Sequence, residues 1–175
     1  MENTSSLTKL TNYINNLTSY GEENNDEISI FIMDTLLENN KLTEIDFSNC
    51  CVYDMHFNNL HKATNLKYID FDSCNITEKS YSQIKNLINL EEIIINDKNF
   101  TDEMLKSFSS LNKLNILDLS CCDKLTYECI KYISKCCPLT KLILDYCNID
   151  KKEIQLLKEE FPNINIQYNT HKYLL

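Results

Sequence analysis

The sequence predicts an α/β solenoid in which strand–helix units stack in a row. One observation is the pattern L-x-x-L-x-L-x-x-(N/C), whose first leucine recurs at Leu42, Leu66, Leu90, Leu114 and Leu139. Successive units therefore begin 24, 24, 24 and 25 residues apart. The other observation is a second set of apolar residues, which follows each pattern and has helical spacing. Two periods that recur in phase across five units indicate a repeat architecture.

Each unit opens with a strand, because the leucines of the pattern alternate with other residues at a period of two. We predict parallel strands centred on residues 43–47, 67–71, 91–95, 115–119 and 140–144. Strands of consecutive units have to be parallel, since every unit returns to the same edge before the next begins.

A helix follows each strand. Apolar pairs three residues apart recur at a fixed distance from each first leucine and define one stripe of a helix. These pairs are Phe57 and Leu60, Tyr81 and Ile84, Leu105 and Phe108, Ile130 and Ile133, and Ile154 and Leu157.

The period and the pattern are those of the leucine-rich repeat, a right-handed βα horseshoe with a parallel sheet on its concave face and helices on its convex face. One unit cannot bury its apolar face alone, so the ends need covering. We expect one structural domain with an N-terminal helical cap at 1–41, five repeats at 42–160 and a C-terminal cap and tail at 161–175.

Composition excludes several classes of function. The chain has 175 residues and a net charge of −9, and all 17 basic residues are lysine. An acidic chain without arginine is a poor nucleic-acid binder, because arginine makes the bidentate phosphate and guanine contacts. Gly21 is the single glycine, which rules out a glycine-rich phosphate loop. We find no membrane span and no secretory signal, and we expect a cytoplasmic or nuclear monomer that does not act at a membrane.

The nine cysteines follow the repeat. Cys50, Cys74, Cys122 and Cys147 occupy the ninth repeat position, where asparagine or cysteine satisfies buried backbone groups along the stack. We expect structural, reduced thiols at this position rather than disulfides. Lys98 stands at the ninth position of the third repeat, and we expect a loosened turn there.

No metal, cofactor or catalytic site emerges. The zinc-like set of Cys50, Cys51, His56 and His61 fits zinc poorly, because histidines five apart lie on different faces of a helix. Cys121 is the most exposed strand thiol, but the neighbouring Asp118 and Asp123 oppose a thiolate. We therefore expect a protein that is not an enzyme and needs no cofactor.

The cysteine-ended repeats, above all KCCPLTKLILDYCNI, resemble those of F-box ubiquitin-ligase substrate receptors over residues 42–168. In that family the repeats hold a substrate protein and an F-box recruits the ligase. Residues 1–41 show no convincing F-box, because they have no LP-x-E start and no tryptophan. The resemblance implies a substrate-recognition or assembly subunit of a larger complex such as a ubiquitin ligase. The stretches IDFSNCCV and FPNINIQ are similar to mitochondrial ATP-synthase coupling factor B, which we rank lower because its arginines are missing.

Function is expected at the third, fifth and seventh strand positions, which point to the concave face and which the core does not need. Seven of these fifteen residues are acidic and one is basic, whereas lysines concentrate on the helices. Two interpretations stay open: charges that keep a sheet soluble, or a binding surface for another protein. Aliphatic and aromatic residues among the acids favour a basic, partly apolar partner segment. The candidate protein-binding residues are Glu44, Asp46, Tyr68, Asp70, Asp72, Glu92, Ile94, Asp118, Ile143, Asp145 and, at the rim, Tyr146, with Ile116 exposed among them.

We predict that no intrachain disulfide forms. Protein kept free of oxidant, denatured without reductant and alkylated, should gain nine alkyl groups by mass spectrometry, one for each cysteine. A stable species that has lost two hydrogens and gains two fewer alkyl groups would contradict the structural interpretation of the cysteines.

Overall fold

The computed structural model describes residues 42–48, 52–133 and 138–170. Within these ranges, six parallel strands form one sheet in chain order: β1 (Glu44–Asp46), β2 (Tyr68–Asp70), β3 (Glu92–Ile94), β4 (Ile116–Asp118), β5 (Lys141–Ile143) and β6 (Asn165–Gln167). The first five lie inside the predicted strand ranges, so the predicted phase is confirmed. The expected cap at 1–41 and the cysteines at 50, 51, 136 and 137 lie outside the described residues.

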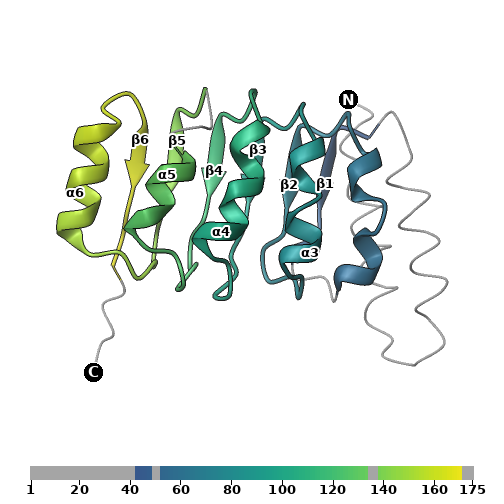
Figure 1. The fold of residues 1–175 in the computed structure, drawn as a ribbon, viewed down its shortest axis with the longest axis horizontal. Coiled ribbons are helices and arrows are strands. Elements are labelled where there is room, and N and C mark those ends of the chain that lie inside the picture. The colour runs from purple at the N-terminus through teal and green to yellow at the C-terminus, as the bar shows by residue number, and fades with distance from the viewer. Residues whose placement is uncertain (1–41, 49–51, 134–137, 171–175) are drawn as a thin grey trace, which may run out of the picture.

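A helical layer covers one face of the sheet, and Figure 1 shows the helices side by side in front of the strands. Its α-helices are α3 (Glu78–Tyr81), α4 (Asp102–Leu105), α5 (Ile130–Ile133) and α6 (Lys151–Glu160). Short 3₁₀ helices complete it: η1 (Asp54–Phe57), η2 (Leu60–Lys62), η3 (Ile84–Asn86), η4 (Lys106–Ser110) and η5 (Tyr127–Cys129). The opposite face of the sheet is the concave face.

The helices α3 and α4 begin at threonine caps. Thr77 Oγ1 accepts a hydrogen bond from the Lys79 amide at the start of α3, and Thr101 Oγ1 accepts one from the Met104 amide at α4. Threonines at helix starts also tie neighbouring repeats together. Asp54 accepts hydrogen bonds from the amide and hydroxyl of Thr77, and Asp102 accepts the same pair from Thr126. Burial opposes ionisation of Asp54, but bonds from Thr77 and Ser80 outweigh it and lower its pKa.

The core lies between the two layers. Registered neighbours such as Ile45, Ile69, Ile93 and Leu117 form one buried row along the strands. The described helical-stripe residues that the sequence predicts are also buried: Phe57, Leu60, Tyr81, Ile84, Leu105, Phe108, Ile133, Ile154 and Leu157. Six aromatic rings pack in sequence through the first repeats, with centroids 4.9 to 6.1 Å apart: Phe47, Phe57, Phe71, Tyr81, Phe100 and Phe108.

The ninth-position cysteines that the structure describes act as the sequence predicts. The Cys74 thiol donates to the Phe47 carbonyl at 3.3 Å, Cys122 to Ile95 at 3.7 Å and Cys147 to Leu119 at 3.0 Å, each in the preceding repeat. Burial raises the pKa of Cys147 to about 12, so the thiol keeps its proton and remains a donor. The ladder therefore links one repeat to the next through buried backbone groups.

The residue before each described ladder cysteine adopts a left-handed conformation, with φ of 59° at Ser73, 59° at Cys121 and 63° at Tyr146. A bulky residue such as tyrosine is uncommon there, at a cost of about 1–2 kcal/mol. The third repeat departs from this turn. Asp97 stands at the same position but does not have a positive φ. Its Oδ1 accepts a hydrogen bond from the Asn99 amide. The sequence predicts a loosened turn at Lys98. The structure has a turn of different backbone shape there, with Asp97 bonded to Asn99.

The C-terminal segment continues the sheet instead of only closing it. Ile166 is buried in β6, which pairs in register with β5, so Lys141 lies beside Asn165 and Ile143 beside Gln167. The Tyr168 hydroxyl donates to the Ile149 carbonyl at 2.5 Å and fixes the segment after the strand. In the part of the chain that the structure describes, no helix has the length and apolarity needed to cross a bilayer.

We predict that Cys147→Ala lowers the free energy of unfolding by about 1–2 kcal/mol. It removes the closer of two donors to the buried Leu119 carbonyl, leaving the Cys122 amide at 3.3 Å, and it opens a small void. Cys121→Ala is the matched control, since Cys121 precedes the ladder cysteine in its repeat and is half-exposed. It should change stability by less than about 0.5 kcal/mol. Urea unfolding followed by circular dichroism measures both, and equal losses would contradict the role of the ladder.

Candidate functional site

Strand register brings the candidate residues into two transverse rows on the concave face. The third-position row is Glu44, Tyr68, Glu92, Ile116, Lys141 and Asn165. The fifth-position row is Asp46, Asp70, Ile94, Asp118, Ile143 and Gln167. The predicted site residues on the strands thus do lie side by side, although 24 or 25 residues separate them in the chain.

Aspartates of the fifth row close the turn at the end of their own strand. Asp46 Oδ1 accepts a hydrogen bond from the Ser48 amide at 2.8 Å, and Asp70 Oδ1 accepts one from the Asp72 amide at 2.7 Å. Asp118 Oδ1 does the same for Ser120, from both its amide and its hydroxyl. These carboxylates therefore stabilise local structure as well as charging the face.

Asp70 is buried, which corrects the expectation that it lies outside the core. Its side chain is 8% exposed, and Oδ2 accepts a hydrogen bond from the Tyr68 hydroxyl at 3.2 Å. Burial raises the pKa of Asp70, and the nearby negative charge of Asp46 adds to this effect. Burial and the charge of Asp70 likewise raise the pKa of Tyr68.

Two more candidates are buried at the C-terminal end of the face. Ile143 lies between Asp118 and Gln167 in the fifth-position row and is buried. The prediction that it is exposed is therefore wrong. Asp145 is also buried, and its two oxygens accept hydrogen bonds from the side-chain amides of Gln167 and Asn169. These amide partners come with β6, which the repeat pattern did not include as a strand.

The remaining candidates are accessible. Glu44 and Tyr146 are exposed, while Asp46, Tyr68, Asp72, Glu92, Ile94, Ile116 and Asp118 are half-buried. Ile94 and Ile116 lie on the adjacent strands β3 and β4 and form an apolar centre. The acids lie mainly on β1 to β3, so the accessible surface has an acidic side and an apolar centre.

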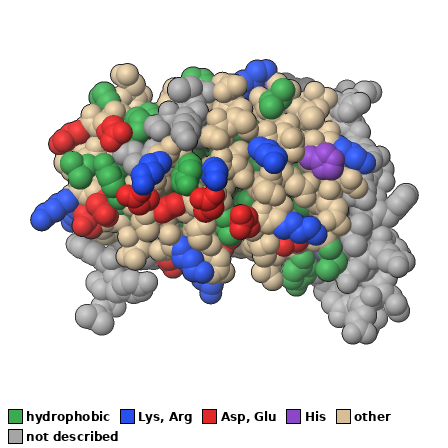
Figure 2. All heavy atoms as spheres, viewed as in Figure 1, with side chains coloured by type: hydrophobic (Ala, Val, Ile, Leu, Met, Phe, Trp, Pro, Cys, Tyr) green, Lys and Arg blue, Asp and Glu red, His purple; other side chains and the backbone are tan. Residues whose placement is uncertain are grey.

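The convex face has a different character. Figure 2 shows lysines and acidic side chains interspersed over the helices. As predicted, described lysines such as Lys79, Lys131 and Lys158 lie on helices, and some pair locally, as Lys106 does with Glu103 at 2.8 Å. The acidic excess therefore belongs to the concave face.

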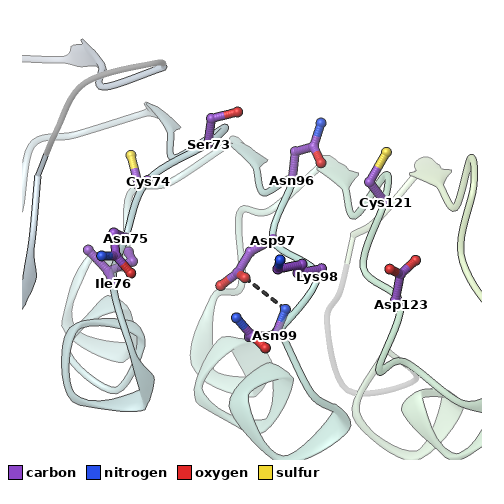
Figure 3. A pocket seen from close by; sticks show the side chains of 10 residues that line it. All are labelled: Ser73, Cys74, Asn75, Ile76, Asn96, Asp97, Lys98, Asn99, Cys121 and Asp123. Atoms are coloured by element: carbon purple, nitrogen blue, oxygen red, sulfur yellow. Dashed lines mark hydrogen bonds between the residues drawn. The ribbon is translucent and has the colours of Figure 1, made fainter.

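A polar hollow of about 360 Å³ opens beside the remodelled third turn. Asn75, Asn96, Asn99 and Asp97 line it, and Figure 3 shows Lys98 among them with Cys121 and Asp123 on the next turn. Sequence reasoning did not include these asparagines, although the irregular residue Lys98 marks the position. This cavity lies at the turn whose backbone differs from that of its neighbours.

The histidines and cysteines take separate structural roles. His56 is buried and its Nδ1 accepts a hydrogen bond from the Tyr53 amide, whereas His61 Nδ1 lies 3.2 Å from Gln83 Oε1. Among the described residues, no group of three or more histidine, cysteine or acidic side chains could hold a metal ion. Burial and the charges of Asp123, Asp72 and Asp118 raise the pKa of Cys121, which makes it a poor nucleophile, as predicted.

Comparison with known proteins supports the fold. Leucine-rich repeat family models match residues 65–87 and 110–134. The solved structure of internalin C2 from Listeria monocytogenes aligns with a TM-score of 0.52 and 18% identity, covering 78% of this chain and 55% of that one. An internalin (InlF) of the same species aligns with a TM-score of 0.37 and 17% identity, covering 89% and 56%. Curated protein sequences give no match.

The chain thus spans about half the length of the two internalins. At 18% identity, the alignment with internalin C2 shows a shared fold and nothing about ligands. Together with the six-stranded parallel sheet of the described residues, it identifies the fold as a leucine-rich-repeat solenoid.

We predict that Asp70→Asn raises the melting temperature at pH 7. A raised pKa means that the folded state holds the proton more tightly than the unfolded chain does. The associated stability is present below the ordinary aspartate pKa and is lost as the pH rises through the folded value. An asparagine side chain carries no charge, so it avoids this loss, and its oxygen can still accept the hydrogen bond from the Asp72 amide. Its stability advantage over aspartate should shrink towards pH ~4, where the aspartate itself becomes protonated.

Asp70→Ala serves as the control, because it removes both the charge and the acceptor for the Asp72 amide. It should lower the melting temperature throughout the pH range. A pH-independent difference between Asp70→Asn and the natural protein would contradict the role of the buried charge.

Proposed function

We propose that this protein is a non-catalytic scaffold that holds a basic, partly apolar segment of another protein on its concave face. The observation that carries the proposal is the alignment of accessible acids and aliphatic residues in two registered rows. Glu44, Asp46 and Glu92 supply negative charge beside the half-buried Ile94 and Ile116. Charged rows steer a partner of opposite sign, while apolar anchors slow its release.

The binding set is narrower than the set that the sequence predicts. Asp70, Ile143 and Asp145 are buried, so we assign them to support of the face. Tyr68 remains a contact residue, because its ring is half-buried and its hydroxyl is held by Asp70. A partner segment then meets carboxylates over β1 to β3 and aliphatic side chains at β3 and β4.

The proposal includes a reduced, intracellular setting in the cytoplasm or nucleus. Three buried cysteines use their thiol proton to bond the preceding repeat, and a disulfide would remove that donor. Nucleic acids and anionic membrane surfaces are not part of the proposal. Both carry negative charge, which the acidic concave face would repel. We take the acting species to be a monomer.

A substrate-recognition subunit of a ubiquitin ligase is the second candidate. The cysteine ladder favours it, because the resemblance to F-box receptors rests on the ninth-position cysteines. Cys74, Cys122 and Cys147 occupy the same place in the second, fourth and fifth repeats. Co-purification of a Skp1-type adaptor would support this candidate. A role like that of coupling factor B ranks below it.

We predict that Glu44→Lys with Glu92→Lys weakens binding of a partner, recovered by affinity purification and mass spectrometry, by about tenfold or more, or ~1.4 kcal/mol. Both side chains lie on the third-position row, away from the turns that the fifth-row aspartates close. Titration calorimetry at several salt concentrations should also show a flatter salt dependence, since salt screens exposed charges over about 8–10 Å.

The matched control is Glu78→Lys with Glu160→Lys, which makes the same change of net charge on α3 and α6 of the convex face. It should leave affinity and salt dependence nearly unchanged. If the two double variants behave alike, the concave face is not the binding site.

A further inference from the structure

A second hollow lies at the C-terminal end of the solenoid, on the edge where the strands end. It encloses about 710 Å³ and is bordered by the turn after β5, the start of α6 and the segment after β6. Its lining includes Tyr146, Ile149 and Tyr168 together with the carboxylates of Asp123, Asp150 and Glu153. Of its lining residues only Tyr146 is a candidate protein-binding residue, and it lies outside the two rows of the concave face.

The carboxylates of α6 are held in place. Asp150 Oδ1 accepts hydrogen bonds from the amides of Lys152 and Glu153, and Glu153 Oε2 accepts one from the Asp150 amide. These capping contacts fix the direction of both side chains without neutralising them. Asp123 adds a third negative charge from the neighbouring turn.

The tyrosines give the hollow an aromatic wall. Tyr168 is anchored through its hydroxyl to the Ile149 carbonyl, and burial together with the charges of Asp150 and Glu153 raises its pKa. Tyr146 is 39% exposed at φ 63°, the backbone position that serine occupies in the second repeat. A tyrosine in this unfavourable conformation presents its ring at the mouth of the cavity.

The hollow beside the third turn provides a contrast within the same edge. Asp123 borders both cavities, but Lys98 lines the first one, as Figure 3 shows, and brings a positive charge to it. No lysine lines the second cavity among the described residues. Aromatic rings, an aliphatic wall and carboxylates with no lysine beside them in the described lining together match an alkylammonium group, through cation–π contact, stem packing and charge.

We propose that this hollow receives a lysine side chain of a partner protein. The methylene stem packs against Ile149 and the tyrosine rings, and the ammonium group lies near Asp123, Asp150 and Glu153. The volume of about 710 Å³ leaves room for backbone on either side of the lysine. This site lies on the strand-end edge and is independent of the two rows on the concave face.

The test uses lysine blocked as its N-acetyl, N′-methylamide and the norleucine compound blocked in the same way, which has no charge. Each is titrated into the full ¹⁵N-labelled chain at constant ionic strength and followed by NMR. Blocked lysine should give saturable shifts confined to residues 123, 146–150, 153 and 168–170, with a dissociation constant on the order of 1 mM. Blocked norleucine should bind at least about fivefold more weakly.

Asp123→Asn should weaken blocked-lysine binding by about threefold or more, and Tyr146→Ser by a similar factor. Serine is suited to this control of the wall, because Ser73 adopts the same backbone conformation. Asp72→Asn removes a carboxylate elsewhere near this edge and should change binding by less than about twofold.

Shifts that do not saturate, equal binding of the two probes, or equal effects of Asp123→Asn and Asp72→Asn would each overturn the proposal. The outcome is separate from that of the concave face. The Glu44→Lys, Glu92→Lys variant should bind blocked lysine as the natural chain does, so either proposal can fail alone.

Discussion

Stacking of neighbouring repeats is the constraint on which the rest of this structure depends. A single strand–helix unit has an apolar interior that it cannot cover, so each repeat completes the core of the next. The row of Ile45, Ile69, Ile93 and Leu117 is buried only because the strands pair in register. Thiols of the ladder cysteines satisfy carbonyl groups that the same stacking removes from water. Core packing and hydrogen bonding therefore require the same repeat spacing.

This constraint decides where function has room. Residues at the fourth and sixth strand positions are committed to the core, as Ile69 and Phe71 illustrate. The third and fifth positions face away from it, and register converts them into continuous rows. Even there the freedom is partial, because Asp46, Asp70 and Asp118 also hold the turns that end their strands. Each of these carboxylates therefore gives the face negative charge and also closes a turn. Replacing one of them would change the charge of the face and remove a hydrogen bond that holds the turn.

Irregular positions add features that a uniform solenoid would lack. At the third turn, Asp97 replaces the left-handed residue and its carboxylate accepts the Tyr81 hydroxyl, which ties the turn to the aromatic core. A cavity lies beside this turn. At the C-terminal end, β6 and α6 bring Tyr168 and Asp150 to the turn of Tyr146. Both cavities lie along the edge where the strands end.

The repeat pattern by itself determined the fold class, the phase of five strands, the buried helical stripes and the role of the ladder cysteines. These follow from local periodicity, which sequence records directly. Tertiary structure decided what periodicity does not encode. Ile143 and Asp145 are buried because a sixth strand pairs beside β5 and supplies Gln167 and Asn169, whose segment lacks the full repeat pattern. Asp70 is buried because Tyr68 lies against it, a contact set by side-chain direction rather than spacing. The shape of the cavities depends on turn geometry, which the sequence marked only through the irregular Lys98.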